Sequence, residues 1–476
     1  MTVTEAPSER VVLVGVVRSQ SQVDEGNESL DELAQLASTA GAEIVDRYIQ
    51  ARPAPDPATY VGKGKAMEIV EAARRLKATA IVFDDELAPS QGRNLEDVAG
   101  VNPLAPDALK IIDRTGLILD VFAQHAHSAE GKLQVELAQI NYMVPRLRGW
   151  GEVMSRIGGS GGGGAAGPSL GTRGPGETKL EIDRRAISRR LKKVKEELKE
   201  VERTRQVKNR QRSRVGSPQI SLVGYTNAGK STLLNAFTGA GVLVEDKLFS
   251  TLDPVSRKLD LPDGRTAVLT DTVGFVRKLP HQLVEAFKST LEQTIRADLL
   301  LHVVDASHVE PKDHIEAVDQ VLMQIGAGDV PRILAMNKSD RLEPDARRRL
   351  EGRFPDAVFV SATTGAGLEG LLESVASRLA ASQTIAEYVI PFDRGDVRSQ
   401  LHELGEVQQE DAAEEGWRMM VKGPRSILGK FGEFVAPFNP PGGAASVTRE
   451  PAPEQRPATE DGAAAADQTD SPGTRP

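Results

Sequence analysis

The 476-residue sequence contains no cysteine, and aromatic residues make up only 4% of it. The lack of cysteine excludes disulfide frameworks, thiolate-ligated zinc, iron–sulfur clusters and catalytic thiols. No apolar run approaches the roughly 20 residues that a transmembrane helix needs. The first apolar run, VVLVGVV, has the length and flanks of a strand, not those of a signal peptide. We therefore expect a cytoplasmic protein without a membrane span, with peripheral association left open.

Positive charge is also in deficit, with 59 Lys and Arg against 68 Asp and Glu and a net charge of −9. This balance argues against a protein that coats nucleic acid along its whole surface. Residues 177–214 are the exception, with 15 basic against 7 acidic residues. A solvated helix face would explain them, but the adjoining glycine-rich stretch 149–178 favours contact with the phosphates of folded RNA. The candidate RNA-contacting residues are Arg148, Arg156, Arg173 and Lys179.

Residues 1–130 predict an N-terminal α/β domain, because apolar strand-like runs alternate with helix-like polar segments. The predicted strands are 11–17, 42–49, 78–85 and 116–123.

Residues 131–214 predict an antiparallel helical hairpin whose long tip is the glycine-rich stretch. Two segments carry the same apolar heptad spacing: Leu133, Leu137, Ile140, Val144 and Leu147, then Ile187, Leu191, Val194, Leu198 and Val201. Pro145 should kink or end the first helix. A structural spacer is the alternative to a ligand-contacting hairpin, and pairing of both seams within it leads us to expect a monomer.

Three further segments complete the chain. Residues 215–383 again alternate strands and helices, which predicts a mostly parallel sheet with helices on both faces. Residues 384–438 read β-α-β-β-α and predict a small α+β domain. Residues 439–476 hold almost no large apolar side chain, so we expect a disordered tail.

The sequence GYTNAGKS at 224–231 follows a strand-like run and precedes a helix. It matches the G-x-x-x-x-G-K-S phosphate loop, in which glycines let backbone amides point at phosphates. Lys230 would meet the β- and γ-phosphates, and the Ser231 hydroxyl would ligate Mg²⁺. The predicted nucleotide contacts from this loop are Gly224, Tyr225, Thr226, Asn227, Ala228, Gly229, Lys230, Ser231 and Thr232.

A second motif, Asp271-Thr-Val-Gly274, ends the strand TAVLT. We expect Asp271 to hold the Mg²⁺ shell, through water, and the Gly274 amide to bond the γ-phosphate. Between the two motifs, Thr251 would close over Mg²⁺ when a γ-phosphate is present, although an ordinary loop threonine is the alternative. Lys230, Thr251 and Gly274 are the predicted catalytic residues.

The motif Asn337-Lys-Ser-Asp340 follows a further strand and predicts selection of guanine. The Asp340 carboxylate can accept from both the N1–H and the exocyclic amine of guanine, which adenine does not offer. Asn337 and Lys338 would brace the loop and cover the ring. Ser361 and Ala362 follow the next strand, where the Ala362 amide could meet guanine O6. These motifs predict that GTP and GDP bind here with Mg²⁺.

Two residues bear on mechanism. Phe275 stands directly after Gly274, where Ras-type GTPases place a water-orienting glutamine, so we expect slow intrinsic hydrolysis and a catalytic element from elsewhere. Asn227 sits where some GTPases use an asparagine beside a K⁺ ion, and a role in the loop turn alone is the equal alternative.

The sequence resembles the HflX family of ribosome-associated GTPases, within the translation-factor-related class. The resemblance rests on long strings outside the GTPase motifs and spans roughly residues 10–435: YVGKGK at 60–65, VFDDELAPSQGRNLE at 82–96, IDRTGLILDVFAQHAHSAEGKLQVELAQINYMVPRLRGWGE at 112–152 and GTRGPGETKLEIDRR at 171–185. The resemblance implies a factor that binds the large ribosomal subunit and its rRNA and splits or rescues stalled or idle ribosomes under stress. The alternative is a GTP-regulated hibernation or assembly factor with incidental hydrolysis.

Overall fold

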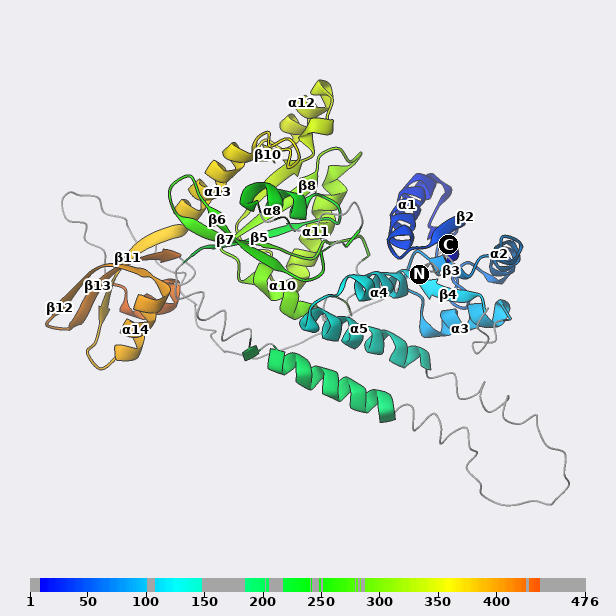
Figure 1. Ribbon diagram of the computed structural model, residues 1–476, viewed down its shortest axis with the longest axis horizontal. Helices are drawn as coiled ribbons and strands as arrows, with labels where there is room; N and C mark the ends of the chain where they lie inside the picture. The colour runs from blue at the N-terminus through cyan, green and yellow to red at the C-terminus, as the bar shows by residue number, and fades with distance from the viewer. Residues whose placement is uncertain are drawn as a thin grey trace, which may run out of the picture.

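In the part of the chain that it describes, the computed structural model has three sheets, and two long helices run beneath the first and second (Figure 1). It describes residues 9–100, 108–147, 185–201, 203–204, 217–239, 241, 248–249, 251–278, 280, 283, 287–424 and 428–436. The predicted tail, the glycine-rich tip and the four candidate RNA-contacting residues lie outside these ranges.

The first sheet has four parallel strands in the order β2-β1-β3-β4. Its elements are β1 (Arg10–Val17), α1 (Val23–Thr39), β2 (Glu43–Ala51), α2 (Lys63–Arg75), β3 (Ala80–Phe83), α3 (Pro89–Val98) and β4 (Lys110–Asp113). Successive strand side chains point to opposite faces. Val11 and Leu13 therefore join the core beside α1, whereas Val12 and Val14 join the core beneath α2 and α3.

The predicted strand at 116–123 is wrong, because these residues lie in helix α4 (Arg114–His125). The Asp113 carboxylate starts the helix by accepting a hydrogen bond from the Gly116 amide at 2.8 Å. Eight of the twelve residues of α4 are buried. A helix buried on several sides shows a continuous apolar run, so its sequence looks like that of a buried strand.

Helix α5 (Ala129–Leu147) and the helix at 185–201 lie side by side, as the hairpin prediction requires (Figure 1). Arg190 pairs with Glu136 across them, and Val194 is fully buried. Helix α5 continues for two residues beyond Pro145, near the predicted end. The apolar heptad contact between the two helices is incomplete at this end, because Val144 is 37% exposed.

The second sheet has the order β10-β9-β8-β5-β7-β6, and only the edge strand β6 runs antiparallel to its neighbour. Its strands are β5 (Gln219–Gly224), β6 (Val255–Asp260), β7 (Thr266–Asp271), β8 (Leu299–Asp305), β9 (Arg332–Asn337) and β10 (Val358–Phe359). The accompanying helices are α8 (Lys230–Thr238), α10 (Lys288–Ile295), α11 (Pro311–Ile325), α12 (Pro344–Arg353) and α13 (Leu368–Ser382). This is the predicted mostly parallel α/β sheet, with β6 as an addition.

The third sheet is antiparallel, with the order β11-β13-β12. It comprises β11 (Gln383–Ile390), α14 (Gly395–Leu404), β12 (Glu406–Ala413) and β13 (Gly416–Pro424), followed by a 3-10 segment at Gly429–Phe434. The order agrees with the predicted β-α-β-β-α pattern. A small core around Tyr388, Leu401 and Met419 holds it together.

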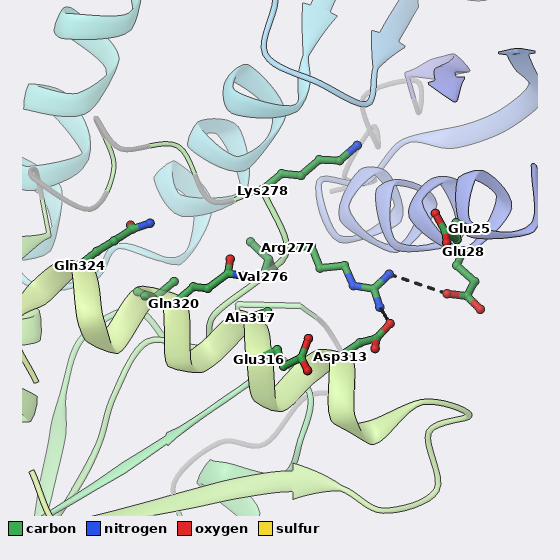
Figure 2. Close-up of a pocket in the computed structure, with 11 residues that line it drawn as sticks. Glu25, Glu28, Val276, Arg277, Lys278, Asp313, Glu316, Ala317, Gln320 and Gln324 are labelled. Atoms are coloured by element: carbon green, nitrogen blue, oxygen red, sulfur yellow. Dashed lines mark hydrogen bonds and ion pairs between the residues drawn. The ribbon is translucent and has the colours of Figure 1, made fainter. Parts of the chain in front are cut away.

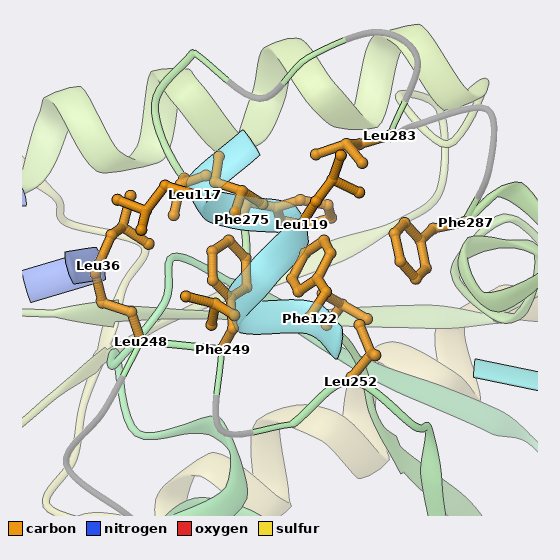
Figure 3. Packing of buried hydrophobic residues seen from close by; sticks show 14 of the residues in the cluster. Leu36, Leu117, Leu119, Phe122, Leu248, Phe249, Leu252, Phe275, Leu283 and Phe287 are labelled. Carbon is orange, nitrogen blue, oxygen red and sulfur yellow. The ribbon is translucent and has the colours of Figure 1, made fainter. Parts of the chain in front are cut away.

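The first and second sheets share one hydrophobic core, centred on α4 (Figure 3). Phe122 from α4 packs edge-on against Phe249 and Phe287, with ring centroids 4.6 and 4.9 Å apart. Phe275, from the segment after Asp271, belongs to the same core and is 1% exposed. The nucleotide motifs are thereby attached directly to the N-terminal part of the chain.

Candidate nucleotide-binding site

The loop between β5 and α8 has the backbone that a phosphate cradle needs. Gly224 has φ 152°, and a Cβ there would lie 2.2 Å from the Val303 carbonyl oxygen. Gly229 has φ 92°, and its Cβ would lie 2.3 Å from the Asn337 amide nitrogen. Both positions therefore require glycine. Asn227, exposed at the loop crest, adopts φ 59°, a left-handed conformation that asparagine tolerates best after glycine.

Lys230 lies inside this cradle. Its ammonium donates to the carbonyl oxygens of Gly224 and Tyr225 at 3.2 and 2.8 Å. Burial lowers the pKa of Lys230 to about 8, against the opposing attraction of Asp271. The side chain is thus held at the loop by neutral acceptors that phosphate oxygens can replace.

Three oxygen-bearing side chains meet beside Lys230. The Ser231 hydroxyl donates to Asp271 Oδ2 at 2.6 Å and lies 2.8 Å from Thr251 Oγ1. Burial raises the pKa of the Asp271 carboxyl, although Lys230 and Ser231 act in the opposite direction. Among the described residues, Asp271 Oδ1 has no hydrogen-bond partner. Hard oxygen ligands around an unsatisfied carboxylate are the chemistry that Mg²⁺ prefers, so the predicted set fits that ion.

Gly274 lies directly over the loop. A Cβ at this position would be 2.8 Å from Thr226 Cγ2 and 3.0 Å from Lys230 Nζ. Two backbone hydrogen bonds tie the segments together: Thr226 N to Phe275 O at 2.8 Å, and Phe275 N to Gly224 O at 3.1 Å. Thr232 continues the first turn of α8, half-buried.

The motif at 337–340 connects the phosphate loop to the loop that follows strand β10. The Asn337 side-chain amide donates to the Ala228 carbonyl at 2.9 Å, and its oxygen accepts from the Ala362 amide at 3.0 Å. Guanine O6 would therefore share the Ala362 amide with Asn337. Lys338 adopts φ 60° and its ammonium lies 2.7 Å from Asp305 Oδ2, a partner that the sequence motifs did not reveal.

The remaining two base-contacting candidates differ in exposure. Asp340 is exposed, so its carboxylate is accessible to an incoming base. Ser361 is fully buried, and its hydroxyl accepts from the Thr364 amide at 3.1 Å, which shapes the loop bearing Ala362. All the predicted nucleotide-contacting residues therefore gather at the carboxyl ends of β5, β7, β9 and β10.

Tyr225 links this site to the first sheet, a role that the phosphate-loop pattern did not indicate. Its hydroxyl donates to Glu32 on α1 at 2.6 Å and accepts from the Arg277 amide at 2.7 Å. Burial and Glu32 raise the pKa of Tyr225, so it stays a neutral donor. The His314 ring stacks on it 3.9 Å away, and burial lowers the pKa of His314 to about 3.

The segment after Gly274 crosses between the two sheets. Lys278 pairs with Asp84 and Asp85 at 2.5 and 2.6 Å, and buried Arg114 pairs with Asp84 from the other side. Burial would raise the pKa of Asp84, but these two cations outweigh it and hold that pKa below its ordinary value. Phe275, at the position where Ras-type GTPases place a water-orienting glutamine, precedes Lys278 by three residues and is buried.

Arg277 lines an open pocket of about 560 Å³ between α1 and α11 (Figure 2). Its guanidinium lies between Glu28 and Asp313, at 3.7 and 2.8 Å. The adjacent residues Arg277 and Lys278 are thus both paired with carboxylates of the N-terminal part of the chain, and Arg277 is also paired with Asp313 of α11.

Within the ranges that the structure covers, no helix is long and apolar enough to cross a bilayer. Three family models match in order along the chain: "GTP-binding GTPase N-terminal" at 27–123, "GTP-binding GTPase Middle Region" at 125–212 and "50S ribosome-binding GTPase" at 219–338.

Named relatives match over most of their length. "GTPase HflX" of Caldanaerobacter subterraneus subsp. tengcongensis is 46% identical over 429 residues, which cover 90% of this chain and 94% of the relative. "GTPase HflX" of Escherichia coli (strain K12) is 44% identical over 411 residues, with 86% and 92% covered. Among solved structures, a GTP-binding protein from Sulfolobus solfataricus in complex with GDP is 22% identical, has a TM-score of 0.39, and covers 78% of this chain and 98% of its own. The chain belongs to the HflX family and is a GTP hydrolase.

Proposed function

We propose that this GTPase binds the large ribosomal subunit in the cytoplasm and splits or rescues stalled or idle ribosomes under stress. The observation that carries the proposal is the burial of Phe275 in a core shared with the N-terminal part of the chain. A site without its own water-orienting side chain needs stimulation from outside. The match of 219–338 to a model described as a 50S ribosome-binding GTPase supports the large subunit as that partner.

The helix at 185–201 supports contact with RNA. Its Arg185, Arg189, Lys192, Lys193, Lys195 and Lys199 side chains are all exposed, on the surface away from Val194. Such a row of cations neutralises phosphates and makes binding salt-dependent. The proposed tip contacts, Arg148, Arg156, Arg173 and Lys179, would extend this surface beyond the described helix.

In the proposed reaction, the loop amides and Lys230 hold the β- and γ-phosphates, and the Gly274 amide bonds the γ-phosphate. Ser231, Thr251 and Asp271 would hold Mg²⁺, which neutralises charge on the phosphate oxygens when bound. Asp340 selects guanine, braced through Asn337 and Lys338. Asn227 is the residue that would contact K⁺, and a K⁺ dependence of turnover would assign it that role.

GTP hydrolysis by the purified protein, alone and with large ribosomal subunits, tests the proposal. We expect slow turnover alone and stimulation by orders of magnitude with subunits, together with separation of intact ribosomes in sucrose gradients. The Lys230→Ala variant is the control for contaminating GTPases. Slow turnover that subunits leave unchanged, or binding without separation, would favour the alternative of a GTP-regulated hibernation or assembly factor. Repeating the assay with Na⁺ in place of K⁺ tests Asn227.

A further inference from the structure

Asp253 contacts the start of helix α5 across a large sequence separation. Its Oδ2 accepts hydrogen bonds from the His127 and Ser128 amides at 3.1 and 2.7 Å, and the Ser128 hydroxyl donates to its Oδ1. Ser128 Oγ in turn accepts from the Gly131 amide at 2.9 Å. Ser128 is therefore the capping residue of α5, and the Asp253 carboxylate completes that cap by accepting hydrogen bonds from the Ser128 amide and hydroxyl.

The contact is closely fitted. A Cβ on Gly131 would lie 2.5 Å from Asp253 Oδ1, so even a methyl group there would displace the carboxylate. Neighbouring side chains of the same loop are also held: Leu252 is 2% exposed, and Phe249 packs on Phe122 of α4. The loop is therefore fixed against α4 and against the start of α5, which is the first helix of the hairpin.

Thr251 precedes Asp253 by two residues and reaches Ser231 Oγ at 2.8 Å. Two residues of extended chain span at most about 7 Å. The Thr251 backbone therefore stays within about 7 Å of the Asp253 backbone for as long as Asp253 stays on α5. The hairpin and the nucleotide site are joined by one short piece of backbone.

We infer that Asp253 is a positioning residue that holds Thr251 at the nucleotide site by capping helix α5. A nucleotide that draws Thr251 inward stabilises the cap, and by reciprocity a displaced α5 weakens binding of that nucleotide. The coupling needs only the protein and nucleotide. A further step, in which RNA contact moves the hairpin and so changes nucleotide affinity on the ribosome, rests on the proposed function.

Hydrogen exchange of the full-length protein, with Mg²⁺ and either GDP or a non-hydrolysable GTP analogue, measures the coupling directly. In the wild type we expect slower exchange of the 127–131 amides with the analogue than with GDP. Asp253→Asn removes the negative charge and one of the two oxygens that accept these three hydrogen bonds, so this difference should shrink markedly. The ratio of analogue to GDP affinity should also fall roughly fivefold. Asp260 is an exposed residue of β6, so Asp260→Asn is the matched control and should keep both properties.

Gly131→Ala separates coupling from stability. Alanine favours a helix more than glycine does, so this variant strengthens α5 while pushing Asp253 away. We expect it to lower the affinity ratio as Asp253→Asn does. Equal 127–131 exchange with both nucleotides in the wild type would overturn the inference, as would an unchanged ratio in both variants. Neither readout uses ribosomes, so failure of subunit stimulation would contradict the proposed function and leave this inference standing.

Discussion

Lys230 is a buried cation whose charge depends on what occupies the loop. The pKa of its ammonium is lowered to about 8 by burial in the described structure. Phosphate oxygens favour the charged form, so nucleotide binding should raise this pKa and take up a proton wherever the free lysine is neutral.

The sign of the resulting pH dependence follows. Below pH 8 Lys230 is already charged and affinity is flat, whereas above pH 8 affinity should fall as pH rises, by up to about tenfold per unit. Titration calorimetry with GDP between about pH 6.5 and 9, in two buffers of different ionisation enthalpy, measures both affinity and proton uptake. Proton release, or a flat affinity across this range, would contradict the expectation.

Asp340 gives a test of base selection. In Asp340→Asn the side chain presents one donor and one acceptor, which match the O2 and N1–H of xanthine but not the amine of guanine. We expect GTP affinity to drop at least about a hundredfold and xanthosine triphosphate to bind in its place. Competition with a fluorescent GDP analogue provides the measurement, and retained preference for guanine would remove Asp340 from this role.

The sequence motifs predicted these residues because a phosphate loop is local: its glycines, lysine and hydroxyl lie within one turn. The partners contributed by other segments could not be predicted in this way. Glu32 on Tyr225 and Asp305 on Lys338 are distant in sequence and carry no motif of their own. Of these two partners, only Asp305 could have been suspected from the sequence, because it ends an apolar strand that lies beside the strand of Asn337.

Helix α4 shows the limits of prediction at the level of the element. Its continuous apolar sequence fits a strand as well as a buried helix. Only Asp113, which caps α4, indicates the helix. Strand β6 was not predicted because its sequence has too little apolar character. Its Arg257, Lys258 and Asp260 side chains are exposed, as is common in edge strands. The elements of the second sheet that carry the motifs follow apolar strands and were predictable.

Phe122 tests the role of α4. It is 1% exposed and contacts two aromatic rings from the second sheet's connections, so Phe122→Ala should lower stability by about 3–5 kcal/mol. Calorimetric melting with and without GDP measures the loss. Val309→Ala, at an 83% exposed site, is a control that should melt like the wild type. A Phe122→Ala protein that also melts like the wild type would show that the two sheets are held together elsewhere.

At the level of the whole molecule, the shared core makes the second sheet depend on the first. A chain comprising residues 217–436 would expose the Phe249, Phe275 and Phe287 side chains to water. We expect it to melt at a lower temperature than the full chain and to bind the dye 8-anilinonaphthalene-1-sulfonate, which reports exposed apolar surface. Equal melting temperatures and no dye binding would mean that these side chains find new partners within the fragment.

The shared core also sets an order of events during synthesis. About 150 residues separate Phe122 from Phe275, so at roughly 5–20 residues per second the ribosome needs about 8–30 s to deliver the partner of an already translated α4. Throughout that interval the apolar face of α4 has no second sheet to cover it. The nascent chain therefore passes through a stage in which its N-terminal part is a substrate for chaperones, and slowing translation between these residues should increase aggregation.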